Sequence, residues 1–238
     1  MKLYFAPLEG ITGFAYRSAH RAMFSGADKY FAPFAAPNYT HRFKAREAAD
    51  IDPANNADVP LVPQILSNRP EDFLWAAGEI RSMGYREINL NLGCPMPTVV
   101  KKGRGSGQLR DLDALDRFLE EICRGMEEYG ISSADGLRLS VKTRIGVEDA
   151  GDAGRLLEIY NRYPIAELTV HPRTQRDLYG GTPDLETFAL FLENSRRPVV
   201  YNGDIFTAGD YCRFRDRFPG CRAVMMGRGL IANPALAR

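Results

Sequence analysis

The sequence predicts a single (β/α)8 barrel, in which eight parallel strands alternate with helices. The first reason is that short apolar segments alternate with helical stretches eight times along 238 residues, close to the roughly 250 residues typical of this barrel. The second is that seven of the segments end in polar or charged side chains. An open, doubly wound sheet shows the same alternation but gathers its chemistry at one switch point. A barrel collects functional groups from many strand ends, so the polar ends favour the barrel.

The predicted strands are apolar runs of six or seven residues, as expected for parallel strands that are buried on both faces. In order along the chain they are 2–8, 29–34, 60–66, 87–93, 137–143, 166–172, 198–204 and 222–228. No linker, low-complexity tract or shift of composition interrupts them, so 1–238 is predicted to be one catalytic barrel.

Amphipathic stretches between the strands predict the helices, for example 112–130 and 148–163. In 112–130 the apolar residues recur at helical spacing, and Cys123 falls on the same face. We therefore predict that Cys123 belongs to the core. Cys212 and Cys221 are expected to be structural as well.

The composition is that of a water-soluble globular protein, with 45% hydrophobic residues, 26% charged residues and a net charge of +1. No apolar run approaches the ~18 residues of a membrane span, and the start of the chain lacks the apolar core of a signal peptide. The four cysteines form no Cys-x-x-Cys pair and the three histidines are scattered. Neither a zinc site nor a disulfide framework is expected, and a reducing cytoplasm is the predicted location.

The ends of the last two strands predict a phosphate-binding site. Each strand ends in glycine just before a helix, in "YNGDIF" and "MMGRGL". Loops at this position of a barrel commonly bind phosphate through backbone N–H groups, and Arg228 adds a suitable cation. Glycines that only close turns would explain Gly203 or Gly227 singly, but not both beside Arg228. The segment 103–108, "GRGSGQ", does not complete Gly-x-Gly-x-x-Gly, so no dinucleotide-binding fingerprint is present.

Three further strand ends predict contacts to a flat heterocycle. The Gln64 amide offers a donor and an acceptor together, and Lys142 can stabilise negative charge on a ring. His171 precedes a proline, which favours extended geometry at the strand end. The alternatives are a capped loop for Gln64, an ion-paired lysine for Lys142 and a satisfied core histidine for His171.

Cys94 ends an apolar strand and enters a loop of glycines and cations. A free thiol has a pKa of about 8.5, so at neutral pH it is mainly protonated and can act as a general acid. The alternative, a thiolate nucleophile, needs a partnered base, and His171 is two strands away. Proton donation fits the pattern better, although a lone cysteine is more often simply buried.

Taken together, these residues resemble the tRNA-dihydrouridine synthase family. The matching segments follow the family's order over essentially the whole chain: "APLEG", "QI", "NLGCP" with "KKGRGSG", "VKTRIG", "VHPRTQ", "YNGDI" and "MMGRG". Other flavin barrels, such as dihydroorotate dehydrogenases, share the phosphate loops but not the Cys-Pro context. The family reduces the C5=C6 bond of uridine in tRNA, using tightly bound FMN that NADPH or NADH recharges.

The resemblance implies a role for each matching residue. Cys94 resembles the acid that protonates C5 while the flavin delivers hydride to C6. The residues that resemble flavin-ring contacts are Pro7, Leu8, Glu9, Gln64, Lys142 and His171. Those that resemble the phosphate grip are Asn202, Gly203, Asp204, Gly227 and Arg228. Asn91, Arg144 and Tyr179 match positions that hold the uracil, which must leave the RNA stack for chemistry to reach its ring.

Basic residues are expected around the mouth of the barrel. The loops 40–46 and 101–104 follow the second and fourth strands, and Arg144, Arg173 and Arg176 are expected on the same rim. Clustered cations on one face suit tRNA or another structured RNA, with a merely solvated rim as the alternative. No membrane and no obligatory protein partner are indicated.

Family members normally continue past the barrel into a helical domain that binds tRNA, whereas this chain stops at Arg238. We expect the natural protein to continue, and the C-terminal RNA-binding domain to be missing here. Two other functions stay open. One is a flavin barrel that reduces a free pyrimidine or another small enone, and the other is a non-catalytic RNA-binding remnant.

Overall fold

The strands form a closed parallel barrel in the computed structural model, which describes residues 1–133 and 135–237. The order around the sheet is β3-β2-β1-β9-β8-β7-β6-β5-β4, and β1 pairs with β9 along its full length. The strands are β1 (Lys2–Phe5), β2 (Lys29–Phe31), β3 (Leu61–Val62), β4 (Gln64–Ile65), β5 (Glu87–Leu92), β6 (Arg138–Arg144), β7 (Glu167–His171), β8 (Val199–Tyr201) and β9 (Ala223–Met226).

The predicted strand 60–66 is divided into β3 and β4 by Pro63, which has no N–H for the ladder. β3 pairs with β2 and β4 pairs with β5, so the ring closes through this proline. The Pro63 carbonyl still accepts a hydrogen bond from Asn89 N at 2.9 Å. Counted as one strand, β3 and β4 give the predicted barrel of eight strands.

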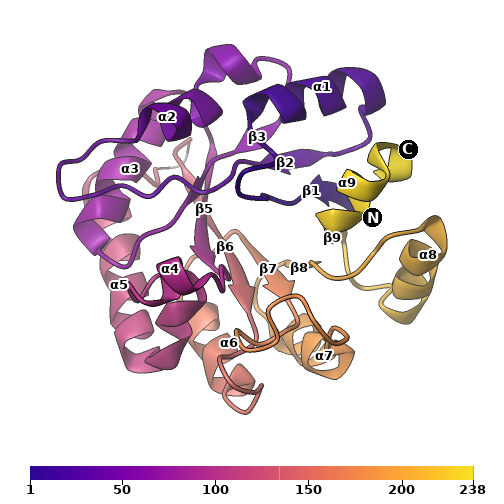
Figure 1. Cartoon of the computed structure of the whole chain (residues 1–238). Helices are drawn as coiled ribbons and strands as arrows, with labels where there is room; N and C mark the ends of the chain where they lie inside the picture. Colours follow the sequence, from indigo (N-terminus) through magenta and orange to yellow (C-terminus); the bar gives the residue numbers. More distant parts are fainter. Residues whose placement is uncertain (134, 238) are drawn as a thin grey trace.

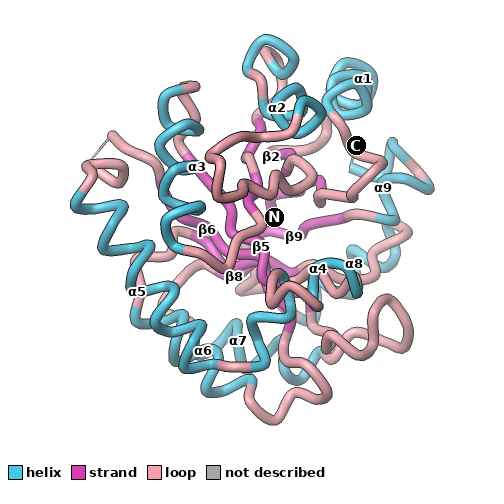
Figure 2. Tube along the Cα trace, turned by 60° about the vertical axis from the view of Figure 1, so that its left-hand side comes forward, coloured by secondary structure: helices cyan, strands magenta, loops and turns pink. Residues whose placement is uncertain are grey.

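Helices surround the ring of strands (Figure 1), and the strands occupy the centre of the molecule in the turned view (Figure 2). The helices are α1 (Phe14–Phe24), α2 (Ala45–Ile51), α3 (Pro70–Ser82), α4 (Pro97–Val100), α5 (Leu112–Glu128), α6 (Ala153–Arg162), α7 (Leu185–Asn194), α8 (Ala208–Arg217) and α9 (Arg228–Ala232). Short 3-10 turns cover Pro53–Asn56, Gly105–Arg110 and Pro234–Ala237. Within 1–133 and 135–237, no helix is both long and apolar enough to cross a membrane.

The cysteine predictions are confirmed in two cases of three. Cys123 packs on the core from α5, and Cys221 is buried. Cys212 is exposed, because α8 turns Phe214 into the core and a residue two positions away points to the opposite side of a helix. Cys212 therefore has no place in the core.

One helix boundary differs from the sequence prediction. α6 begins at Ala153 rather than at 148, because the Asp149 carboxylate accepts from Gly151 N and forms a turn in front of the helix. After β9 the chain forms the five-residue α9 and then a 3-10 turn that Pro234 begins. This turn packs on α1, where His20 Nε2 lies 3.0 Å from the Pro234 carbonyl oxygen.

Candidate active site

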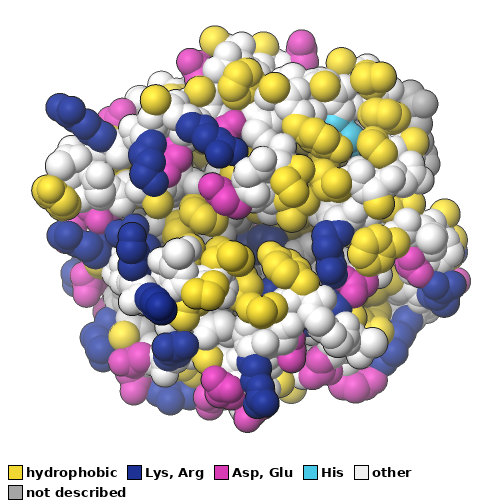
Figure 3. Space-filling view, viewed as in Figure 1, with side chains coloured by type: hydrophobic (Ala, Val, Ile, Leu, Met, Phe, Trp, Pro, Cys, Tyr) yellow, Lys and Arg dark blue, Asp and Glu magenta, His cyan; other side chains and the backbone are white. Residues whose placement is uncertain are grey.

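A cavity of about 600 Å³ opens at the C-terminal ends of the strands. Figure 3 shows it as a hollow ringed mainly by hydrophobic side chains. Every residue predicted for the site lines this cavity, which confirms that the fold brings them together: Pro7, Leu8, Glu9, Gln64, Asn91, Cys94, Lys142, Arg144, His171, Tyr179, Asn202, Gly203, Asp204, Gly227 and Arg228. The sequence prediction missed the apolar wall, which includes Phe34, Met96 and Phe206.

Hydrogen bonds from two directions hold the Cys94 backbone. Its N–H donates to Asn91 Oδ1 at 2.9 Å, and its carbonyl accepts from both the N–H and the hydroxyl of Ser106. Between these residues Gly105 has φ +59°, and a Cβ there would lie 2.6 Å from the Cys94 carbonyl oxygen. Only glycine fits this close approach. The glycines after the strand therefore serve to fold the loop back onto Cys94.

The thiol of Cys94 is half-buried and protonated at neutral pH. Burial raises the pKa of the Cys94 thiol, although Lys142 and Arg144 pull it down. Burial prevails because a thiolate loses more hydration in the cavity than the two cations return. The group is therefore suited to giving a proton rather than to acting as a nucleophile.

Lys142 extends into the cavity from β6 without a partner. Among the residues that the structure describes, none forms a hydrogen bond or ion pair with its ammonium group. Burial and the nearby Arg144 lower the pKa of Lys142 to about 7. A buried cation without an acceptor is costly, so this side chain is prepared for a ligand that supplies one.

The amides beneath the cavity form a ladder across β4 and β5. Gln64 Nε2 donates to Asn89 Oδ1 at 2.7 Å, and Asn91 Nδ2 donates to Gln64 Oε1 at 2.8 Å. Asn91 Oδ1 accepts from the N–H groups of Gly93 and Cys94. Part of the hydrogen-bonding capacity of each amide is thus used by bonds within the protein. What remains for a ligand on Gln64 and on Asn91 includes the second N–H of each.

Two of the three arginines expected on the rim are buried, so that prediction is wrong for them. Arg144 donates to the carbonyls of Gly93, Thr174 and Leu178. Arg173 is 1% exposed and binds Asp204. Both residues thereby tie together loops of the cavity wall. Arg176 alone is on the surface, 74% exposed.

The end of the cavity at β8 and β9 is more crowded than the sequence suggests. A Cβ on Gly203 would lie 2.0 Å from the Tyr201 hydroxyl, so packing alone requires this glycine. α9 has only five residues, so the expected helix terminus contributes little. Arg228 binds Asp204 at 2.5 Å and lies over the rings of Tyr179 and Phe206.

The charge of Asp204 is well compensated. Its burial alone would favour the neutral acid, but Arg173 and Arg228 on either side hold the pKa of Asp204 below its usual value. Asp204 is therefore ionised at neutral pH and aligns Arg228 at the cavity mouth. Asn202 in turn joins β8 to β9, donating from Nδ2 to the Met225 carbonyl at 2.8 Å.

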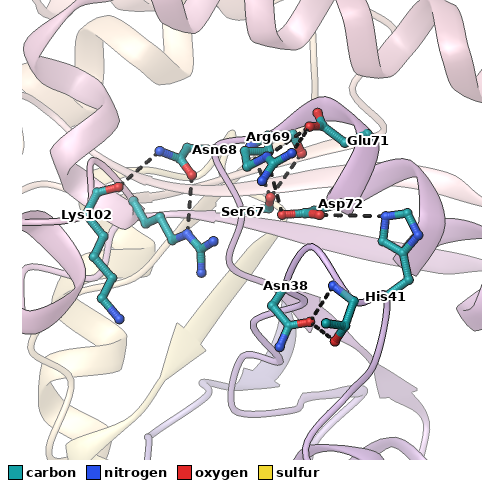
Figure 4. Close-up of polar contacts among 10 residues, drawn as sticks. Asn38, His41, Ser67, Asn68, Arg69, Glu71, Asp72 and Lys102 are labelled. Atoms are coloured by element: carbon teal, nitrogen blue, oxygen red, sulfur yellow. Dashed lines mark hydrogen bonds and ion pairs between the residues drawn. The ribbon is translucent and has the colours of Figure 1, made fainter.

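The rim of the mouth carries exposed cations on loops that are fixed to one another (Figure 4). His41 Nε2 lies 3.7 Å from Asp72 Oδ1, which joins the loop after β2 to the start of α3. Asn68 donates to the Lys102 carbonyl and accepts from Arg104 Nε. The side chains of Lys101 and Lys102 are left exposed to solvent, and Figure 3 shows dark blue side chains gathered on this side of the hollow.

Comparison with known proteins finds relatives along nearly the whole chain. A family model described as "Dihydrouridine synthase (Dus)" matches residues 4–238. The chain is 28% identical to the tRNA-dihydrouridine(16) synthase of Ralstonia nicotianae, over 99% of this chain and 71% of that protein. It is 27% identical to a probable tRNA-dihydrouridine synthase of Staphylococcus aureus, over 96% of this chain and 68% of that protein.

Solved structures with the same fold include two distant enzymes. Histamine dehydrogenase from Rhizobium superposes with a TM-score of 0.73 at 13% identity, over 99% of this chain and 45% of that one. Morphinone reductase superposes with a TM-score of 0.64 at 14% identity, over 99% of this chain and 84% of that one. At these identities the likeness shows the shared barrel fold.

Proposed function

The chain belongs to the dihydrouridine synthase family, and from that premise we propose that it reduces the C5=C6 bond of uridine in tRNA, with FMN as its cofactor. The observation that carries the proposal is the content of one cavity. A protonated thiol, an unpartnered lysine and an arginine at the mouth share a space of about 600 Å³ with apolar walls. We place the reaction in the cytoplasm, with NADPH or NADH as the reductant.

The cavity fits a flavin in size and in chemistry. Ligand sites of roughly 300–1,000 Å³ with apolar walls and a few polar groups are usual for cofactors. Lys142, whose ammonium has no acceptor among the residues that the structure describes, would face the polar edge of the ring, with Gln64 beside it. Arg228 and the loop at Gly203 would hold the phosphate, and Pro7, Leu8, Glu9, His171, Asn202, Asp204 and Gly227 complete the proposed cofactor site.

The proposed reaction divides the addition to the double bond between two donors. FMN, when bound and reduced, supplies the hydride for C6 of the uracil. Cys94 gives its proton to C5, where the electron pair of the double bond arrives, and the resulting thiolate recovers a proton from solvent. Asn91, Arg144 and Tyr179 would hold the uracil, which has to leave the RNA stack to enter the cavity.

We expect dihydrouridine to appear in tRNA when the protein is produced in cells that lack their own synthases. Chemical mapping of the modified positions in total tRNA measures this directly, and the Cys94→Ala chain serves as the matched negative control. Activity on free uracil without activity on RNA would replace the proposal by a small-molecule reductase. If the purified protein binds RNA but is colourless, and so holds no flavin, the proposal would be replaced by a non-catalytic RNA-binding function.

The rim cations give a second expectation, which separates RNA binding from cofactor binding. Replacing Lys101, Lys102 and Arg104 together by Ala should weaken tRNA binding. The slope of the logarithm of the binding constant against the logarithm of the salt concentration should become shallower by about two to three, because fewer counterions are released. Flavin retention should stay the same, whereas Arg228→Ala should lower it. Filter-binding titrations at several salt concentrations and flavin absorbance measure the two properties.

The control for this triple variant removes the same charge from the other end of the barrel. Lys2, Arg196 and Arg222 are exposed and lie just before or at the start of strands. Their replacement by Ala should leave both the affinity for tRNA and its salt dependence unchanged. Equal losses in the two triple variants would show that the rim cations act only through net charge.

A further inference from the structure

Arg173 is a buried cation at the cavity wall to which the proposed reaction gives no role. Its Nε donates to the Gly180 carbonyl, and its Nη2 donates to the Gly181 carbonyl and to Asp204 Oδ2. Its Nη1 lies 3.2 Å from Asp204 Oδ1 and 3.2 Å from His171 Nε2. Every N–H of the guanidinium therefore has an acceptor, and these bonds together hold its orientation.

The contact with His171 determines the protonation of that ring. A guanidinium can only donate hydrogen bonds, so the nitrogen it faces must carry a lone pair rather than a proton. His171 Nε2 is consequently the acceptor. A neutral imidazole with an unprotonated Nε2 carries its proton on Nδ1.

We propose that Arg173 is a positioning residue that fixes His171 as the neutral Nδ1–H tautomer, so that the ring offers the cavity a hydrogen-bond donor and no acceptor. His171 lines the cavity, and no described residue bonds to its Nδ1. The N–H is thus available to a carbonyl oxygen, imine nitrogen or phosphate oxygen of a bound ligand. The inference concerns the protein alone and does not depend on the proposed reaction.

The surroundings support a ring that stays neutral. Burial, together with Lys142, Arg144, Arg173 and Arg228, holds the pKa of His171 well below its usual range. Asp204 does not reverse this effect, because its carboxylate is bound to Arg173 and Arg228. The ring is therefore neutral at neutral pH and offers the cavity a donor rather than a charge.

His20 serves as an internal reference, because its contacts select the opposite tautomer. His20 Nε2 lies 3.0 Å from a carbonyl oxygen, which can only accept, and its Nδ1 lies 2.8 Å from the Tyr30 hydroxyl. His20 is therefore the Nε2–H tautomer, the form that also predominates for histidine in water. With three histidines in the chain, ¹⁵N NMR of the imidazoles is readily assigned by His171→Asn and His41→Gln.

The test is a long-range ¹H–¹⁵N spectrum of the whole protein at neutral pH. We expect a protonated Nδ1 and an unprotonated Nε2 for His171, and the reverse for His20. Arg173→Lys keeps the positive charge but removes the planar guanidinium and its set of N–H groups. In this variant the main tautomer of His171 should become Nε2–H, while that of His20 is unchanged. An Nε2–H or doubly protonated His171 in the parent protein would overturn the proposal, as would an unchanged tautomer in the variant.

A second variant covers the case in which Arg173→Lys does not fold. Asp204→Asn leaves Arg173 in place but removes the charge that aligns its fork. We expect the Nδ1–H fraction of His171 to fall there too, by less than in Arg173→Lys. Because the Gly180 and Gly181 carbonyls still hold the guanidinium in this variant, the decisive result is the tautomer of His171 in the parent protein, where a protonated Nε2 would contradict the assigned role of Arg173.

Discussion

Replacing Cys94 by Ala is expected to lower the rate of uridine reduction by about 10²- to 10⁴-fold, the usual contribution of a positioned general acid. Flavin binding and reduction by the nicotinamide cofactor should be retained, because Cys94 is assigned only to the protonation of C5. Single-turnover mixing of the reduced protein with unmodified tRNA measures the step directly. Flavin oxidation in this experiment should be slow in the variant and fast in the parent.

Two comparisons distinguish an acid from a structural thiol. Cys212→Ala removes an exposed thiol on α8 and should leave the rate unchanged. Burial raises the pKa of the Cys94 thiol, so its alkylation by iodoacetamide should keep increasing with pH beyond the range in which a free cysteine has levelled off. A Cys94→Ala chain that turns over at the parent rate would remove Cys94 from the mechanism.

The barrel and the polar strand ends that line its site could be predicted from the sequence because both depend on local pattern. Apolar runs that end in a polar side chain mark the C-terminal end of a barrel strand, and the fold brings all such ends to one mouth. Cys94, Lys142 and His171 needed no knowledge of tertiary contacts to be placed there. The division of a strand at Pro63 changes the hydrogen-bond ladder but not the side of the barrel on which Gln64 lies.

The sequence does not predict which arginines already donate their N–H groups to acceptors within the protein. Arg144 and Arg173 are surrounded in sequence by other polar residues, and nothing local separates them from Arg176. They are buried because backbone carbonyls distant in sequence, such as Gly93 for Arg144, accept their N–H groups. Such partners are carbonyls that every residue possesses, so their positions become known only when the loops are folded.

The lowered pKa of Lys142 is a second property that only the folded structure reveals. It makes the affinity for a ligand depend on pH. In the free protein the pKa of Lys142 is lowered to about 7 by burial, with help from Arg144. A ligand atom that accepts a hydrogen bond from the ammonium group favours the charged form and raises that pKa. Binding must then take up a proton wherever the pH lies above about 7.

The affinity for FMN is therefore expected to fall with rising pH between 7 and 9, by up to roughly tenfold per unit, because an increasing share of the free protein has a neutral Lys142 that must be protonated on binding. Below about 7 this dependence should disappear, since the free side chain is already charged. Flavin fluorescence titrations across this range measure the slope, and calorimetry in two buffers of different ionisation heat should show uptake approaching one proton. The phosphate of FMN, with a pKa of about 6, is already doubly ionised there and does not contribute. Lys142→Met should bind FMN weakly and with no slope, and a slope that persists in this variant would assign the titration to another group.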